Sequence, residues 1–461
     1  MYTNTPGELL ERYGFAPGDL VRLQVSFPSQ PHTGKEHRSS LVCLILEKGS
    51  RSRDENLIVK LSNGYNLSLD ARCIEGVDLI ERSADRQGPE GLQGTSGQGV
   101  KIVLVGTGGT IASMVDYRTG GVHPAMTPKE LYDAVPDIPG ICDLELVVAS
   151  SILSEDVTVE HWDEYTRYVQ EAFSSGAKGV VIAHGTDTLA STSAALSFTL
   201  QAPPGPIVLT GSQRSSDRPS SDSRLNLKHS LILASSDVPG GVYVLMHASI
   251  NDGPSLIHLG TRVRKMHSTR RDAFVSIDRL PVGAVIDDSL KVLDLPGKAE
   301  GEFEARPGFN DRVLLISSQT GDLGPVLETV AKEYSGLVIA GSGMGHIHSR
   351  YLDRIRDLTG RGIPVVMTTD CISGSTDLDV YATGRDLLDA GVIPAGDMLP
   401  HVAQIKTMWV LNALKDVRPS RMIPGFRELF LGNMAGEISD RRVIGSFGQE
   451  YLKTLRDLGV E

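Results

Sequence analysis

The sequence predicts an α/β protein with two doubly wound parallel sheets, preceded by a small all-β domain. Two features of the chain carry this prediction. From Val100 onward, short apolar runs alternate with glycine-rich turns and segments of helical periodicity, an order typical of parallel sheets with right-handed crossovers. Before Val100, apolar and polar residues alternate with a period of two, as they do in half-buried strands. With 461 residues, the chain is long enough for two or three domains.

Residues 1–82 are expected to form a small barrel-like or sandwich-like domain of about five strands. Residues 19–25 alternate apolar with polar side chains, and residues 40–46 and 56–61 are apolar, β-prone runs. Asn63-Gly64 separates two such runs, and an Asn-Gly pair in this position is a strong signal for a β-hairpin.

The rest of the chain is predicted to contain a linker and two α/β domains. Residues 83–99 are rich in Gly, Ser, Gln, Pro and charge, which is typical of a flexible linker. A larger α/β domain is expected over residues 100–296 and a smaller one over residues 310–461, with a Pro/Gly/acidic stretch between them. The expected strands are 101–105, 144–149, 179–183, 207–210, 241–246, 313–316, 336–340 and 364–367, and the expected helices are 159–174, 352–359 and 403–414.

The composition excludes several classes of protein. Hydrophobic residues make up 40% of the chain and charged residues 22%, as in soluble globular proteins. No apolar run approaches the roughly 18 residues of a membrane span, and the polar N-terminus predicts no secretory signal. The four cysteines lie far apart without a CxxC pair, so neither a disulfide framework nor a zinc site is expected. We therefore expect a cytoplasmic protein, and the net charge of −12 argues against non-specific nucleic-acid binding.

Two segments that follow buried strands carry candidate chemistry. Gly106-Thr107-Gly108-Gly109-Thr110-Ile111-Ala112 follows one apolar run, and His184-Gly185-Thr186-Asp187-Thr188 follows another. We expect both to be loops at the carboxyl ends of parallel strands, where open α/β sheets bind their ligands. Thr110 and Thr186 supply hydroxyls and Asp187 a carboxylate, which suggests a threonine nucleophile with its activating group.

Each of these residues also has a plainer interpretation. The segment 106–110 lacks both the Lys-Ser/Thr ending of a P-loop and the GxGxxG spacing, which argues against nucleotide binding. Thr110 or Asp187 could instead cap a helix. A further candidate, Lys265, lies in a basic segment where most lysines are merely solvated. Their joint occurrence favours catalysis.

The two segments resemble the two signature segments of the bacterial-type L-asparaginases. Thr210-Gly211-Ser212-Gln213-Arg214, with Asn226-Leu227 downstream, resembles a third. The resemblance extends from about residue 100 to the end of the chain and implies the asparaginase-like fold of two doubly wound α/β domains.

The resemblance also implies roles for single residues. It makes Thr110 the residue that forms the acyl-enzyme, and Thr186, Asp187 and Lys265 the group that activates it. A threonine hydroxyl is a poor nucleophile and needs a base. Lys265 paired with Asp187 could draw the proton through Thr186, and Asp187 could also bind the α-ammonium of the substrate.

The resemblance also implies residues that bind the substrate. Ser154 matches the serine that holds the α-carboxylate, with Glu155 beside it. The turn around Gly109 offers backbone N–H groups that can stabilise an oxyanion. Tyr117 is the candidate lid tyrosine, in the segment 117–123 that we expect to move. No metal ligand is expected.

The layout before the first motif distinguishes among asparaginase relatives. A free-standing asparaginase begins almost at this motif, whereas here residues 1–98 precede it. This layout, with Glu55–Asn66 in the extension, resembles the D subunits of archaeal-type glutamyl-tRNA(Gln) amidotransferases. An added β module is more plausibly a docking surface than part of an amidase site.

This second resemblance implies both chemistry and partners. Thr110 attacks the side-chain amide of glutamine, and the released ammonia passes to the E subunit of the amidotransferase, which amidates glutamate attached to tRNA(Gln). No cofactor is expected in this chain, because ATP and Mg²⁺ belong to the partner, and contact with tRNA(Gln) occurs mainly through the partner. The chain is expected to form a homodimer within a heterotetramer. Gly341-Ser342-Gly343-Met344-Gly345-His346 is then expected to complete the neighbouring pocket.

Two other functions stay open on the sequence alone. One is a free-standing L-asparaginase, because the preference between amides that differ by one methylene is only weakly encoded. The other is a non-catalytic α/β protein that keeps the site for ligand sensing. Loss of a site residue would favour the second, but Thr110, Thr186, Asp187 and Lys265 are all present.

Overall fold

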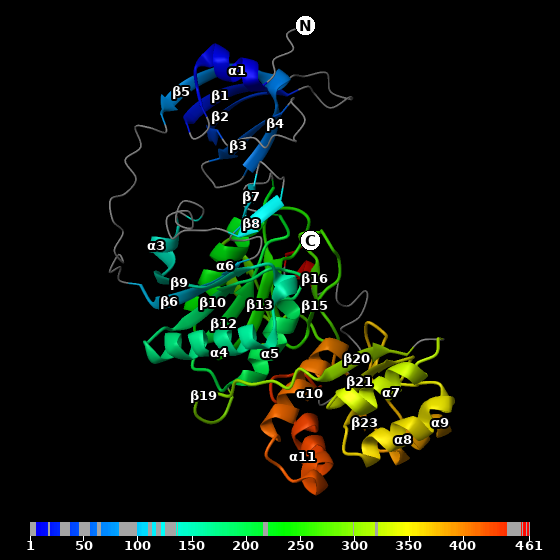
Figure 1. Ribbon diagram of the computed structural model, residues 1–461. Helices are drawn as coiled ribbons and strands as arrows, with labels where there is room; N and C mark the ends of the chain where they lie inside the picture. Colours follow the sequence, from blue (N-terminus) through cyan, green and yellow to red (C-terminus); the bar gives the residue numbers. More distant parts are fainter. Residues whose placement is uncertain are drawn as a thin grey trace.

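The computed structural model consists of a β-rich N-terminal part followed by two α/β lobes (Figure 1). The predicted linker, residues 83–99, lies outside the described residues except for Gly99. The structure describes residues 6–16, 19–27, 37–45, 56–61, 66–82, 99–108, 113–116, 121–124, 135, 137–214, 220–297, 299–318, 321–439, 453, 455–457 and 459–460.

The N-terminal part is a five-stranded antiparallel sheet with the order β4-β3-β2-β1-β5. Val21, Leu23 and Val25 alternate along one strand into a buried cluster that also receives Leu9 from a short helix, as the alternating sequence predicts. The predicted hairpin is present, with Lys60 opposite Asn66, although its Asn-Gly turn lies outside the described residues. The elements are α1 (Pro6–Tyr13), β1 (Leu20–Phe27), β2 (His37–Ile45), β3 (Asn56–Leu61), β4 (Asn66–Asp70), η1 (Ala71–Cys73) and β5 (Ile74–Glu81).

The first α/β lobe, residues 99–297, contains an eight-stranded sheet with the order β18-β17-β14-β13-β12-β10-β6-β9. Its strands are β6 (Lys101–Gly108), β9 (Asp143–Ile152), β10 (Gly179–Ala183), β12 (Pro206–Thr210), β13 (Gly241–His247), β14 (Ser255–Leu259), β17 (Gly283–Ile286) and β18 (Ser289–Val292). Shorter strands are β7 (Ser113–Asp116), β8 (Gly121–Pro124), β11 (Leu200–Gln201), β15 (Val263–Lys265) and β16 (Phe274–Ser276). After the lobe, β19 (Glu304–Ala305) returns to pair with β11.

The expectation of a parallel sheet holds for only part of this lobe. The strands from β9 to β13 run parallel, but β14, β17 and β18 continue the sheet in antiparallel pairs. Only residues 248–254 connect β13 to β14. A parallel crossover needs a dozen or more residues, so this short connection reverses the chain. The sheet is therefore mixed.

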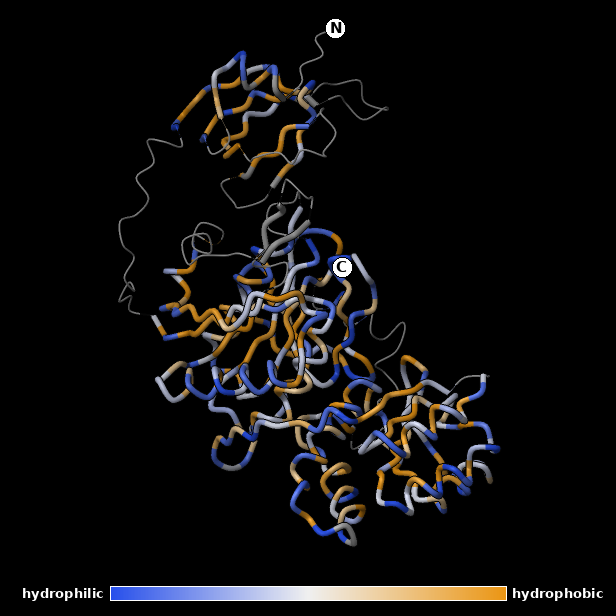
Figure 2. The backbone as a smooth tube through the Cα atoms, viewed as in Figure 1, coloured by the Kyte–Doolittle hydropathy of each residue, from blue (hydrophilic) through white to orange (hydrophobic). Residues whose placement is uncertain are grey.

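Helices cover both faces of the sheet. The core on one face includes α4 (Val159–Ser174) and α5 (Leu189–Thr199), and that on the other includes α3 (Ile138–Ile141) and α6 (Ser223–Ser235). Helix α4 has the predicted bounds, begins at a Thr158–His161 capping box and buries Trp162, Tyr165 and Val169 on one side, the spacing of an amphipathic helix. Figure 2 shows the hydrophobic colour concentrated in the strands, while the outer turns of these helices are more hydrophilic.

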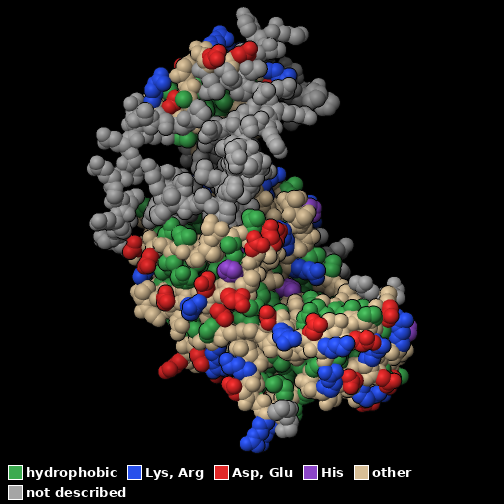
Figure 3. Space-filling model, in the orientation of Figure 1, with side chains coloured by type: hydrophobic (Ala, Val, Ile, Leu, Met, Phe, Trp, Pro, Cys, Tyr) green, Lys and Arg blue, Asp and Glu red, His purple; other side chains and the backbone are tan. Residues whose placement is uncertain are grey.

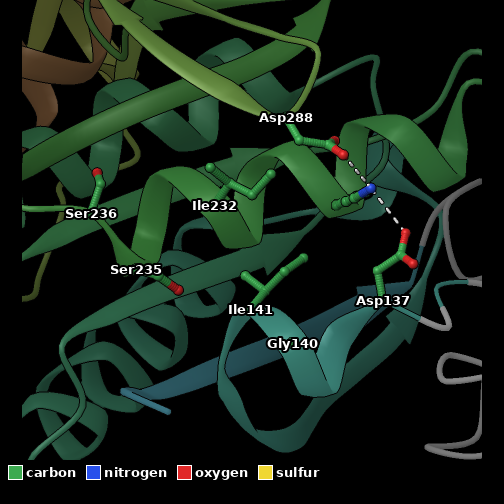
Figure 4. A pocket seen from close by; sticks show the side chains of 8 residues that line it. Asp137, Gly140, Ile141, Ile232, Ser235, Ser236 and Asp288 are labelled. Carbon is green, nitrogen blue, oxygen red and sulfur yellow. Dashed lines mark hydrogen bonds and ion pairs between the residues drawn. The ribbon is translucent and has the colours of Figure 1, made fainter.

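An ion-pair cluster joins α6 to the loops on its face of the sheet. Lys228 Nζ lies 2.7 Å from Asp288 Oδ2 and 2.9 Å from Asp137 Oδ2. Figure 4 shows Asp288 and Asp137 pointing toward this amine from two sides of a shallow hollow, which Ile141 and Ile232 also line. Both carboxylates pair with the same ammonium group, so these ion pairs explain the charged residues that line the hollow.

The second α/β lobe, residues 312–439, has a four-stranded parallel sheet with the order β20-β21-β22-β23. Figure 3 shows acidic and basic side chains interspersed over the exposed face of this lobe. Its elements are β20 (Val313–Ser317), α7 (Gly324–Glu333), β21 (Gly336–Gly341), η5 (Ser349–Tyr351), α8 (Leu352–Gly360), β22 (Val365–Thr369), α9 (Ala382–Asp389), β23 (Ile393–Pro394), α10 (Pro400–Ala413) and α11 (Pro419–Leu431).

Contacts between the lobes are extensive. Helix α10 packs against both α5 and the sheet of the second lobe, so one buried cluster continues from the first lobe into the second. Lys406 of α10 forms a fully buried ion pair with Glu437. Close to the end of the chain, Leu455 and Val460 pack against Leu256 of the first lobe. The chain thus returns to the first lobe after completing the second.

Candidate active site

The second predicted motif forms the loop between β10 and α5. Thr186 is 8% exposed, and its Oγ1 accepts a hydrogen bond of 2.9 Å from Lys265 Nζ. The same amine lies 2.6 Å from Asp187 Oδ1. Lys265 ends the short strand β15, so a lysine far along the chain meets the adjacent Thr186 and Asp187, with which it was predicted to act.

The three side chains differ in their access to solvent. The Lys265 side chain is only 13% exposed, whereas that of Asp187 is 66% exposed. Surface pairs of this kind contribute little to stability, so stability alone gives little reason for their arrangement. Lys265 is held against the hydroxyl of Thr186, while the Asp187 carboxylate remains open to a further cation. This geometry allows proton exchange at Thr186 and recognition of an ammonium group beside it.

Ser154 lies directly against this loop. It begins the 3-10 helix η4 (Ser154–Asp156) after β9 and is 6% exposed. Its carbonyl accepts a 2.6 Å hydrogen bond from Thr188 Oγ1. A Cβ on Gly185 would lie 2.6 Å from Ser154 Cβ, so this close approach requires glycine at position 185. The structure therefore brings Ser154 to the site, with the exposed Glu155 next to it.

The first motif begins as a strand, contrary to the prediction of a loop from Gly106. Strand β6 continues through Gly108, and β9 pairs along it with a shift in register after Gly106. Gly108 has φ +97°, and a Cβ there would lie 2.4 Å from Ile152 O, so the strand passes this point only as glycine. Thr107 Oγ1 donates to Ala183 O at 3.0 Å, which joins the end of this strand to β10.

Gly109, Thr110 and Tyr117 lie outside the described residues, so their roles stay predictions. The described residues that follow Thr110 form β7, which pairs with β8. These residues form a strand, whereas the capping interpretation of Thr110 requires a helix at this point. Part of the predicted mobile segment 117–123 likewise belongs to β8.

Two buried polar residues, Asp222 and Asn226, hold the third motif; Asn226 was part of the sequence resemblance, whereas Asp222 was not predicted. Asp222 is fully buried and accepts hydrogen bonds from the backbone amides of Gln213 and Arg214. Asn226 Nδ2 donates to Gly211 O at 2.9 Å, and its Oδ1 accepts from His247 Nδ1 at 2.8 Å. Burial raises the pKa of Asp222. Its position four residues before Asn226, at the start of a helix, was the only signal in the sequence.

The Asp222–Asn226 pair also bears on the candidate site. A Cβ on Gly211 would lie 2.9 Å from Thr186 Cγ2. The backbone at Gly211, which Asn226 holds, therefore packs directly against the Thr186 side chain.

Arg262 is a second feature that the sequence did not reveal. It directly precedes β15, is 1% exposed, and forms an ion pair of 3.0 Å with Asp397 of the second lobe. The same guanidinium donates to Gly436 O, Asp397 O and Ser439 Oγ. The strand that carries Lys265 is thus anchored at its start to the second lobe.

The segment expected to complete a neighbouring pocket lies at the carboxyl end of β21. Gly341 ends this strand, and Ser342 and His346 form a β-bridge that closes the turn. The His346 ring contacts the ring of Tyr381, with centroids 5.5 Å apart. Its contribution to a second copy stays a prediction.

In the described ranges, the His, Cys, Asp and Glu side chains form no group of three or more that could hold a metal ion. No described helix is long and apolar enough to cross a membrane.

The comparisons with known proteins bear on the whole chain. Residues 101–296 match the family described as Asparaginase, N-terminal, and residues 312–421 match the Glutaminase/Asparaginase C-terminal domain. The D subunit of the glutamyl-tRNA(Gln) amidotransferase of Thermofilum pendens is 38% identical over 95% of this chain and 97% of its own length. That of Thermococcus kodakarensis is 40% identical over 94% of this chain and 96% of its own.

The chain belongs to the family of glutamyl-tRNA(Gln) amidotransferase D subunits.

Solved asparaginases match a smaller part of it. The thermostable L-asparaginase from Thermococcus kodakarensis has a TM-score of 0.67 and 36% identity, and covers 74% of this chain and 100% of its own. A probable cytoplasmic L-asparaginase from Campylobacter jejuni has a TM-score of 0.59 and 26% identity, and covers 72% of this chain and 100% of its own. The two D subunits extend over a further fifth of this chain, consistent with the layout that the sequence analysis used to distinguish the relatives.

Proposed function

We propose that this chain is an amidohydrolase that releases ammonia from glutamine for a tRNA-dependent amidotransferase. The meeting of Thr186, Asp187 and Lys265 beside Ser154 carries the chemical part of this proposal, because these side chains suit activation of a hydroxyl and capture of an amino acid. Relatives named as D subunits, matched over almost the whole chain, support the biological part.

The proposed reaction has two halves. Thr110 Oγ attacks the amide carbon of the glutamine side chain, and its proton passes through Thr186 Oγ1 to Lys265 in the amine form. The tetrahedral intermediate collapses, the C–N bond breaks, and the same proton returns to the leaving nitrogen, so ammonia departs and an ester to Thr110 remains. Water then attacks the ester by the reverse proton route and yields glutamate and free Thr110.

The described residues supply binding as well as proton transfer. Ser154 holds the α-carboxylate of glutamine, and the exposed carboxylate of Asp187 binds its α-ammonium group. Ammonia then passes to the E subunit, where ATP and Mg²⁺ drive amidation of glutamate on tRNA(Gln). The same proposal includes a homodimer, in which the segment 341–346 of one copy completes the pocket of the other. It also includes tRNA contact mainly through the E subunit.

One assay separates this proposal from a free-standing asparaginase, which the match to the solved asparaginases favours as the second candidate. Ammonia release is measured from glutamine and from asparagine, with and without the E subunit carrying Glu-tRNA(Gln). We expect glutamine turnover that rises sharply with the charged partner. Fast asparagine hydrolysis that is indifferent to the partner would favour the second candidate, and no ammonia release under any condition would leave the non-catalytic binding protein.

A further inference from the structure

A buried polar network lies beneath the candidate site and begins on helix α4. Trp162 and Tyr165 are three residues apart, so they share one face of this helix. Both are buried, at 8% and 0% exposure. Each side chain starts a separate series of hydrogen bonds toward one of the two threonine motifs.

The Trp162 series ends on the loop that carries Thr186. Trp162 Nε1–H donates to Thr192 Oγ1 at 3.1 Å, so the hydroxyl proton of Thr192 is available to His184 Nε2 at 3.0 Å. With Nε2 as the acceptor, the proton of the neutral ring lies on Nδ1, which donates to Gly185 O at 2.7 Å. His184 is fully buried, and burial lowers its pKa to about 4, so the ring stays neutral near pH 7.

The direction of the Gly185–Thr186 peptide follows from this series. A trans peptide points its N–H and its C=O to opposite sides. Because the carbonyl of Gly185 is held against His184 in the interior, the amide of Thr186 points away from His184. The series thus fixes a backbone donor in the loop that also presents the Thr186 hydroxyl to Lys265.

The Tyr165 series ends on the motif that carries Thr110. Ser150 Oγ donates its single proton to Thr107 O at 3.0 Å. Tyr165 must therefore be the donor in its 3.1 Å hydrogen bond to Ser150 Oγ, and burial, which raises the pKa of Tyr165, keeps that proton in place. Thr107 lies three residues before Thr110.

The two series contact each other. The rings of Tyr165 and His184 meet edge to face, with centroids 6.1 Å apart. Thr107 Oγ1 donates to Ala183 O, one residue before His184. The two motifs therefore rest on one shared support, which buries its polar groups in hydrogen bonds to backbone carbonyls.

We propose that Trp162 and Tyr165 are positioning residues for amide hydrolysis. Neither touches substrate. Trp162 acts through Thr192 and His184 on the carbonyl of Gly185, and Tyr165 acts through Ser150 on the carbonyl of Thr107. Helix α4 thereby sets the two threonine motifs relative to each other. This inference rests on the proposed amidohydrolase function and adds to it the residues that align its two halves.

Two isosteric substitutions form a matched test of the first series. Thr192→Val removes the hydroxyl that His184 accepts from, and Thr166→Val removes a fully buried hydroxyl on α4 that bonds Trp162 O and Thr199 instead. We expect similar losses of Tm from both. Only Thr192→Val should lower kcat for glutamine, by about tenfold to a hundredfold, with little change in KM, because small misplacement of reacting groups costs about that much. Thr192→Ser should restore kcat.

The second series has its own matched pair. Tyr165→Phe removes the donor to Ser150, and Tyr243→Phe removes a hydroxyl that donates to Pro239 O elsewhere in the same lobe. We expect only Tyr165→Phe to lower kcat. If the wild-type protein hydrolyses glutamine and the two variants of each matched pair lose kcat equally, the positioning role is overturned. The proposed function then still stands.

A measurement that needs no activity keeps the two proposals separate. The ring ¹⁵N shifts of His184 report which nitrogen carries the proton. We expect the Nδ1–H form in the wild-type protein, because Gly185 O accepts from Nδ1. In Thr192→Val the Nε2 signal should shift, because this nitrogen loses its hydroxyl donor. An Nε2–H ring in the wild type would overturn the inference, even if glutamine is hydrolysed. A wild-type chain that releases no ammonia with its charged partner would overturn the proposed function, whatever the tautomer.

Discussion

Replacement of Lys265 by methionine tests the proton route most sharply. Methionine keeps most of the apolar stem and removes the amine that lies 2.9 Å from Thr186 Oγ1 and 2.6 Å from Asp187 Oδ1. A positioned acid or base typically contributes about 10²–10⁴ in rate, which corresponds to about 3–5 kcal/mol of activation free energy. We therefore expect kcat for glutamine to fall by about two to four orders of magnitude.

Stability should change little in the same variant. Because the Asp187 side chain is 66% exposed, loss of its partner should cost no more than about 1 kcal/mol in the free energy of unfolding. Steady-state ammonia release and a thermal melt on the same preparation separate the two effects. Lys178→Met is the matched control, because Lys178 pairs with Asp237 at 2.7 Å on the surface, in the same lobe. A Lys265→Met protein that keeps kcat within about threefold of the wild type would refute the proposed proton route.

Three further substitutions test separate parts of the structure. Gly185→Ala places a Cβ 2.6 Å from Ser154 Cβ, so we expect Ser154 to be displaced and KM for glutamine to rise about tenfold in steady-state assays. Arg262→Ala leaves Asp397 without its buried partner, so urea titration should show a loss of about 3–5 kcal/mol in the free energy of unfolding. Burial lowers the pKa of His258 to about 3, so the unfolded chain takes up a proton first as pH falls. The free energy of unfolding is therefore unaffected above about pH 6.5 and is lowered by about 3 kcal/mol at pH 4. His258→Asn should remove this loss from a plot of stability against pH.

Each of these predictions has a result that would contradict it. Gly140→Ala is the control for Gly185→Ala, because a Cβ at position 140 meets open space and should leave KM unchanged. A KM for Gly185→Ala equal to that of this control would argue against the close contact with Ser154. An unchanged urea midpoint for Arg262→Ala would show that the ion pair between Arg262 and Asp397 adds no stability. Parallel stability–pH curves for His258→Asn and the wild type would contradict the assigned burial effect.

The parts of the fold that the sequence predicted well are those set by local pattern. The strand at residues 179–183 is apolar throughout because both of its faces are covered, and its predicted bounds match the structure. The helix at 159–174 follows from helical spacing and from the cap at Thr158. Register and direction were harder to predict. Gly108 resembled a turn residue, yet it continues β6, because its role depends on the approach of Ile152 from another strand.

The candidate site divides in the same way. The sequence motifs identified Thr186, Asp187 and Lys265, and the structure brings these three together. Trp162 had the sequence pattern of an ordinary core residue, since apolar periodicity cannot distinguish a ring that only packs from one whose N–H also donates. Arg262 had the pattern of a solvated arginine, because its partners come from a lobe more than a hundred residues away.

The central claim is that a threonine of this chain forms an ester with the substrate, and a covalent adduct tests it directly. The purified chain, with the E subunit and Glu-tRNA(Gln), is treated with a diazoketone analogue of glutamine and digested, and the modified peptide is mapped by mass spectrometry. We expect one adduct on Thr110 in the wild type and none in Thr110→Ala, whose thermal melt should match the wild type. An adduct on another residue, or glutamine turnover by the Thr110→Ala protein, would contradict the account.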